Sequence, residues 1–92
     1  MKTRLIGPCN FQDVSKYCTQ CDFAYRLPSI NELESILLKS GIEHTTFWSS
    51  TEEGEDLVWT GACVHGNFWK GDNDHDPTSK NAVHYALLIQ LK

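Results

Sequence analysis

Apolar residues recur at helical spacing in two segments of the first half of the chain. The first segment follows Asn10, a good N-cap residue, and its apolar positions are Phe11, Val14, Tyr17 and Cys18. The apolar positions of the second segment are Ile30, Leu33, Ile36 and Leu37. The pattern predicts helices over residues 10–19 and 29–40, preceded by a short strand at Leu5-Ile6.

The ends of the second helix carry strong local signals. Pro28 holds the preceding residue extended, Ser29 is a good N-cap, and Glu32 stands where it completes a capping box. At the other end Lys39 places a cation in the last turn, and Gly41 suits the left-handed cap position. These signals predict a helix with both ends defined by the sequence.

After Gly41 the pattern changes to short strands. We expect strands over residues 47–50, 57–64 and 82–89, separated by the polar run 52–56 and by a long polar stretch over 71–81. Helices followed by strands are typical of an α+β domain. The sequence thus predicts one domain, residues 1–92, with two helices packed on a small, mainly antiparallel sheet with long loops.

Two motifs carry a family resemblance. The run from Tyr25-Arg26-Leu27-Pro28-Ser29 into the second helix, followed by Phe47-Trp48-Ser49-Ser50-Thr51, resembles the C-terminal domains of Lcl-type adhesins and the tip domains of intimin- and invasin-like proteins. The resemblance implies a C-type-lectin-like fold, which hosts binding modules more often than enzymes. The last strand, residues 84–90, has the family's Tyr but lacks its Cys and Arg. This difference favours an intracellular descendant, such as a small phage or prophage protein, over a secreted adhesin tip.

Charge and hydropathy exclude some classes of function. The chain has 92 residues, a formal net charge of −4 and only eight Lys and Arg, which are scattered, so we expect no nucleic-acid binding. No apolar run is long enough to cross a bilayer, so we expect no membrane insertion. The N-terminus lacks the apolar stretch of a signal peptide. We therefore expect a cytoplasmic protein if the chain is full length, and an extracellular one if it was excised from a longer adhesin.

Four cysteines raise the question of a metal site. Their positions are Cys9, Cys18, Cys21 and Cys63, and the spacing of Cys18 and Cys21 lets two thiolates reach one zinc ion. The other ligands would come from Cys9 and Cys63 or from His65. Two alternatives stay open: two disulfides in an oxidising compartment, or four reduced thiols with Cys18 and Cys63 buried.

A polar stretch over residues 71–78 could bind a hard cation. Asp72, Asp74 and Asp76 alternate there, and calcium takes oxygen ligands of this kind. The spacing does not match an EF-hand, because Pro77 and Val83 occupy the positions that need Gly and Glu. The alternative interpretation is a solvated loop whose Asp, Asn, Gly and Pro residues provide turn geometry.

The aromatic residues suggest where recognition occurs. Trp48 and Trp59 lie inside predicted strands, so we expect them to pack in the core, whereas Trp69 has Gly and Lys neighbours and is expected to be exposed. The loop Gly66–Thr78 is therefore the predicted recognition site. Its candidate binding residues are Phe68, Trp69, Lys70, Asp72, Asp74 and Asp76.

These observations predict a binding module without catalytic activity, which engages a protein or a glycan through the long loops between Thr60 and Asn81. No histidine or serine lies in a recognisable nucleophile motif. One alternative is a zinc- or calcium-dependent protein or enzyme of the same fold. Another is an intracellular regulator that inhibits a host protein. The sequence does not indicate an oligomeric state.

Overall fold

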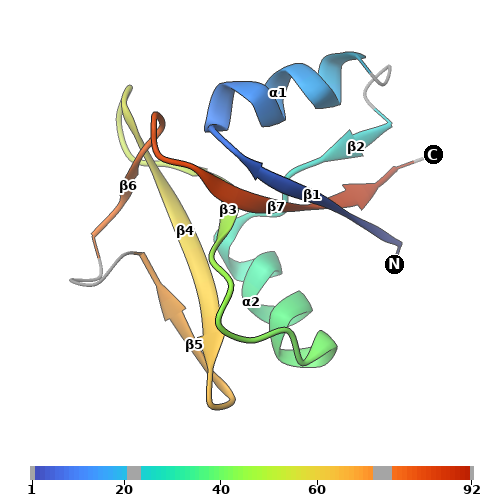
Figure 1. Ribbon diagram of the computed structural model, residues 1–92, viewed down its shortest axis with the longest axis vertical. Helices are drawn as coiled ribbons and strands as arrows, with labels where there is room; N and C mark the ends of the chain where they lie inside the picture. The colour runs from blue at the N-terminus through green and yellow to red at the C-terminus, as the bar shows by residue number, and fades with distance from the viewer. Residues whose placement is uncertain (1, 21–23, 72–75, 92) are drawn as a thin grey trace.

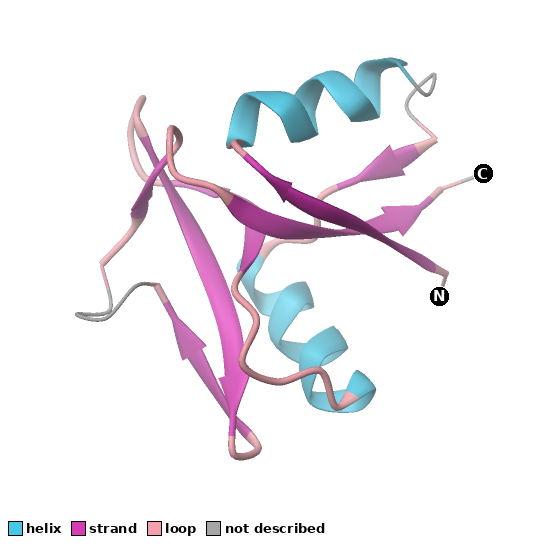
Figure 2. Ribbon diagram, viewed as in Figure 1, coloured by secondary structure: helices cyan, strands magenta, loops and turns pink. Residues whose placement is uncertain are grey.

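The computed structural model describes residues 2–20, 24–71 and 76–91, which form an α+β arrangement (Figure 1). Its two helices are α1 (Phe11–Gln20) and α2 (Ile30–Ser40). Strands within the same ranges are β1 (Thr3–Cys9), β2 (Tyr25–Arg26), β3 (Phe47–Glu52), β4 (Leu57–Val64), β5 (Asn67–Lys70), β6 (Thr78–Ser79) and β7 (His84–Gln90). Figure 2 distinguishes the helices, in cyan, from the strands, in magenta.

The sheet is mixed, and most of its pairings are antiparallel. Its main path runs β1-β7-β3-β4-β5, while β2 pairs with β7 and β6 pairs with β4. The parallel pairing joins β3 to β7 at Phe47 and Tyr85. In this path β1 and β5 are the outer strands.

The core consists of two apolar clusters, one against each helix, because side chains along the central strands point alternately to the two faces of the sheet. On β7, Ala86 and Leu88 belong to a cluster that includes Val14 of α1, while Leu87 belongs to a cluster that includes Leu33 of α2. Successive residues of a strand point to opposite faces, and the helices lie on opposite sides of β7 (Figure 1). The sheet therefore has a packed layer on each side.

The helix ends follow the signals in the sequence. Asn10 Oδ1 accepts a hydrogen bond of 2.9 Å from the Asp13 amide, which caps α1. Ser29 and Glu32 form the predicted capping box at α2, and Gly41 ends that helix with a left-handed φ of 74°. The predicted helices are confirmed, with bounds shifted by one residue for α1 and by one at the start of α2.

The two motifs that carry the family resemblance meet in space. The Arg26 guanidinium donates two hydrogen bonds of 2.8 Å to the Glu32 carboxylate. Across the gap, the Ile30 amide donates to Thr51 Oγ1 at 3.0 Å, and the Ser50 amide donates to the Pro28 carbonyl at 2.8 Å. The motifs thus join the start of α2 to β3, which is a structural role.

The prediction of long loops between Thr60 and Asn81 is wrong in part. Asn67–Lys70 form β5, which pairs with the second half of β4, and Thr78–Ser79 form β6, which pairs with its first half. The backbone N–H and C=O groups of these residues bond to β4, whereas in a long loop they would bond to water. Phe68, Trp69 and Lys70 therefore lie on a strand, where alternate residues face opposite sides.

Candidate functional site

The predicted binding residues that the structure describes lie mainly on a tight hairpin formed by β4 and β5. Val64 pairs with Asn67, so His65 and Gly66 are the two central residues of the turn. Their φ angles are 54° and 80°. Positive φ at both positions is the geometry of a type I′ turn, which matches the twist of the two strands. The turn therefore fixes the register of β5 on β4.

Phe68 anchors this hairpin to the core. It pairs with Cys63 across the hairpin and packs against the cluster of α2. A Cβ atom added to Gly61 would lie 2.4 Å from Phe68 Cζ, so the ring occupies the space that any other residue at position 61 would fill. Phe68 is half-buried and serves first as a packing residue.

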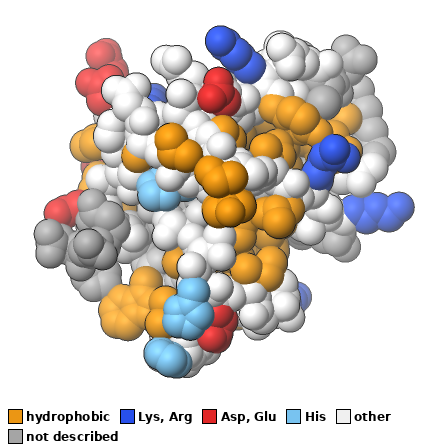
Figure 3. All heavy atoms as spheres, in the orientation of Figure 1, with side chains coloured by type: hydrophobic (Ala, Val, Ile, Leu, Met, Phe, Trp, Pro, Cys, Tyr) orange, Lys and Arg blue, Asp and Glu red, His pale blue; other side chains and the backbone are white. Residues whose placement is uncertain are grey.

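Trp69 is presented to solvent, as the sequence predicts. Its side chain is 47% exposed, while Trp48 is fully buried. Trp69 pairs with Ala62 on the outer strand of the sheet, one position from Phe68, so it faces the side of β5 opposite to Phe68. Figure 3 shows hydrophobic side chains at the surface over this region. A rigid backbone thus displays a large aromatic ring.

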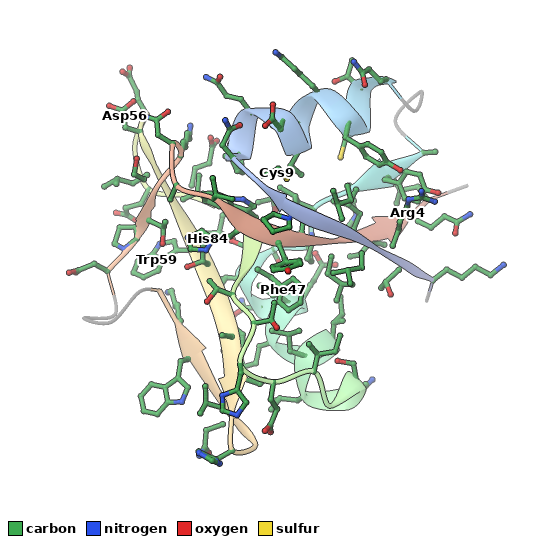
Figure 4. All side chains as sticks on the ribbon, viewed as in Figure 1. Arg4, Cys9, Phe47, Asp56, Trp59 and His84 are labelled. Carbon is green, nitrogen blue, oxygen red and sulfur yellow. The ribbon has the colours of Figure 1, made fainter. Side chains whose placement is uncertain are left out.

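Lys70 lies over a second tryptophan. Its Nζ atom is 4.2 Å from the centroid of the Trp59 ring, within the range of a cation–π contact. Trp59 is half-buried, and its Nε1 donates a hydrogen bond of 3.3 Å to Glu53 Oε2. Trp59 is labelled in Figure 4, on β4. The sequence predicted Trp59 as a core residue; the structure gives it a polar partner as well as apolar ones.

The predicted acidic stretch is described only at one end. Asp72 and Asp74 lie outside the described residues, and Asp76 is exposed. The predicted calcium site therefore stays a prediction.

The cysteines divide between the two apolar clusters. Cys9 of β1 and Cys18 of α1 are half-buried against the cluster of α1, whereas Cys63 of β4 is buried in the cluster of α2. Cys21 lies outside the described residues. Within the described ranges, no three His, Cys, Asp or Glu side chains gather as metal ligands. The structure does not bring Cys63 to the side of the sheet that holds Cys9 and Cys18.

The electrostatics of Cys9 and Cys63 favour the neutral thiol. Burial raises the pKa of Cys9, and the nearby Asp13 raises it further. Burial also raises the pKa of Cys63, with added contributions from Glu43 and Glu34. A metal ligand or nucleophile is the thiolate. Both sites therefore oppose the form that such chemistry needs.

One pairing was not foreseen from the sequence: Cys9 lies opposite His84 across β1 and β7. The imidazole of His84 packs on Trp48 with ring centroids 5.0 Å apart, and burial lowers the pKa of His84 (Figure 4). A thiolate–imidazolium pair would need the opposite shifts, a lowered thiol pKa and a raised imidazole pKa. The pKa shifts of Cys9 and His84 thus favour a neutral thiol beside a neutral imidazole.

Two grooves elsewhere on the described surface are lined mainly by residues with polar or charged side chains. One of about 430 Å³ lies where α1 approaches Lys80 and Asn81. Another of about 530 Å³ lies between Thr3 and α2, and its carboxylate, Glu32, is held by Arg26. Arg26 and Ser29 together lower the pKa of Glu32 to about 2. A carboxylate held in this way is a poor proton donor at neutral pH.

Comparison with protein-family models and with curated proteins gives no match for this chain. Neither described helix has the length and apolar composition that spanning a membrane requires. The family resemblance therefore rests on the sequence motifs alone.

Proposed function

We propose that the chain is a C-type-lectin-like binding module without catalytic activity, and that it engages a protein partner through the outer face of β5, with Trp69 as the apolar anchor. The observation that carries the proposal is the 47% exposed Trp69 on a hairpin whose neighbouring residue, Phe68, packs against the core. The two helices, the mixed sheet and the contact between the two motifs support the proposed fold.

The exposed aromatic ring of Trp69 suits a protein interface. Lys70 follows Trp69 on β5 and is exposed, but it lies with Glu53 at Trp59 on the opposite face of the hairpin, so the face that Trp69 occupies is the apolar one. Interfaces typically combine a central aromatic anchor with a polar rim, and truncating such an anchor commonly costs at least about 2 kcal/mol of binding energy. The rigid turn at His65 and Gly66 lowers the ordering cost of binding.

The test compares two truncations of exposed apolar residues. Trp69→Ala removes the proposed anchor, and Leu5→Ala, on the outer strand at the far end of the sheet, is the matched control because Leu5 is 57% exposed. Partners captured by the parent from an extract of the native host are identified by mass spectrometry and then titrated as purified proteins. A glycan array, probed in parallel, tests the carbohydrate alternative.

We expect Trp69→Ala to melt like the parent and to bind the purified partner at least about 30-fold more weakly, while Leu5→Ala binds normally. A large loss of thermal stability in Trp69→Ala would place this residue in the core and refute the proposal. Equal binding by the two variants would move recognition away from β5. Saturable binding to a glycan that Trp69→Ala loses would replace the protein partner with a carbohydrate.

A further inference from the structure

Two histidines from separate segments of the chain meet at the end of the β4 to β5 hairpin. The rings of His44, from the loop after α2, and His65, from the hairpin turn, have centroids 5.6 Å apart and an interplanar angle of 86°. Both residues are exposed. Figure 3 shows histidine side chains side by side at this end of the molecule. The proposed binding function assigns no role to either imidazole ring.

The backbones that carry the two rings are fixed to each other. The His44 amide donates a hydrogen bond of 2.9 Å to the Cys63 carbonyl on β4. The Gly66 amide donates one of 2.8 Å to Glu43 Oε2, so the residue before His44 holds the residue after His65. Among the described residues other than glycine, His44 and His65 are the ones with positive φ. The loop and the turn thus form one small structural unit.

We propose that His44 and His65 form a two-imidazole site for a divalent transition metal of the class of Zn²⁺, Ni²⁺ and Cu²⁺. A metal about 2.1 Å from an imidazole nitrogen lies roughly 3.2 Å from the ring centroid. Two such ligands at a bond angle of about 110–120° have centroids roughly 5.2–5.5 Å apart. The observed separation of 5.6 Å is close to this range, and rotation of two exposed side chains is enough to aim a nitrogen of each ring at one ion.

The chemistry of the pair selects the class of metal. Imidazole suits Zn²⁺, Cu²⁺ and Ni²⁺, whereas Ca²⁺ and Mg²⁺ prefer oxygen ligands. Within the described ranges no third His, Cys, Asp or Glu completes a ligand group, so water fills the remaining positions. The site is therefore weaker than a structural zinc site with four protein ligands. A bound ion would clamp the loop after α2 to the hairpin turn.

The test uses tag-free protein and two asparagine variants, His44→Asn and His65→Asn. Asparagine tolerates the left-handed backbone at both positions but lacks the imidazole. Zn²⁺ binding is measured by titration calorimetry, and Ni²⁺ is added to isotope-labelled protein to map the site by broadening of amide signals. We expect saturable Zn²⁺ binding by the parent, at least tenfold weaker binding by each variant, and broadening centred on residues 43–45 and 64–66.

Three further measurements separate this site from other donors. Cys21→Ser and His75→Ala, at positions outside the described residues, should bind Zn²⁺ as the parent does, and Ca²⁺ should not compete. The proposal is overturned if the parent shows no saturable Zn²⁺ binding, if His44→Asn and His65→Asn bind normally, or if Cys21→Ser or His75→Ala abolishes binding. Should one asparagine variant fail to fold, the other variant and the Ni²⁺ map of the parent decide.

Discussion

Replacing Gly61 with alanine tests how the hairpin is attached to the core. A Cβ at this position would lie 2.4 Å from Phe68 Cζ, 2.6 Å from Phe68 Cε1 and 3.3 Å from Leu33 Cδ2. The first two distances are far inside van der Waals contact. Since Leu33 is fully buried in α2 and cannot retreat, the Phe68 ring must move outward from the cluster.

The loss of stability in Gly61→Ala depends on how far the colliding side chain can move. Overpacking a formed core by one methyl group typically costs about 1–3 kcal/mol. Phe68 is half-buried, so its ring has a way out toward solvent, and displacing it forfeits part of its burial. We expect Gly61→Ala to lower the free energy of unfolding by about 1–3 kcal/mol. Each kcal/mol corresponds to roughly 4–8 °C in melting temperature for a domain of this size.

The assay is urea and thermal unfolding followed by circular dichroism, with a matched alanine control. Gly7→Ala adds the same methyl group on β1, where nothing lies within 4 Å of the new atom, and should change stability by less than about 0.5 kcal/mol. The decisive variant combines Gly61→Ala with Phe68→Ala. Without the Phe68 ring the added methyl group has room, so in that background Gly61→Ala should cost almost nothing. An equal cost in both backgrounds, or a Gly61→Ala protein as stable as the parent, would refute the packing argument.

Two further predictions concern α2. Leu33→Asp places a carboxylate in a fully buried position and should unfold the domain, which far-ultraviolet circular dichroism would show as loss of the native spectrum; a folded variant would mean that α2 is wrongly phased. The lowered pKa of Glu32, about 2, means that its contribution to stability is complete above its ordinary pKa near 4.5 and is lost as the pH falls through about 2. The difference in urea stability between the parent and Glu32→Gln should therefore shrink between pH 5 and pH 2, and a constant difference would contradict it.

The elements with complete local signals could be predicted from the sequence. Ser29 and Glu32 cap α2, Gly41 ends it in the left-handed conformation, and Asn10 caps α1. Each signal acts within a few residues, so tertiary context does not alter it. The predicted strand over residues 57–64 matches β4, because apolar and hydroxyl residues fill every position of it except Gly61.

Strand β5 was missed because it is short and flanked by residues typical of loops. Gly66 and Gly71 border it, and its four residues do not alternate clearly between apolar and polar. A usable signal was present in the pair His65-Gly66 between Val64 and Asn67. Gly favours positive φ and His adopts it more readily than most residues, so such a pair between strand-forming segments is typical of a two-residue hairpin turn.

Whether the four cysteines lie close together could not be predicted from their spacing along the chain. Cys63 lies on the face of β4 toward α2, whereas Cys9 and Cys18 pack toward α1. The side of the sheet on which a residue lies depends on strand register and on which helix covers each face, and a shift of one residue reverses it. Spacing along the chain carries no information on either. The same reasoning explains why the pairing of Cys9 with His84 was not foreseen.

Side chains along β5 point alternately to its two faces, so the residues that pack the hairpin onto the domain lie on one face and the exposed Trp69 lies on the other. Gly61 and Phe68 lie on the face toward α2, and Lys70 lies on that side over the ring of Trp59. Trp69 is the residue between Phe68 and Lys70, so the pleat turns it to the other face. Because Phe68 and Lys70 make the contacts on the other face, we expect that Trp69 can be exchanged without a change in the fold of β5. We therefore expect the stability of the hairpin and the chemistry of its exposed face to vary separately.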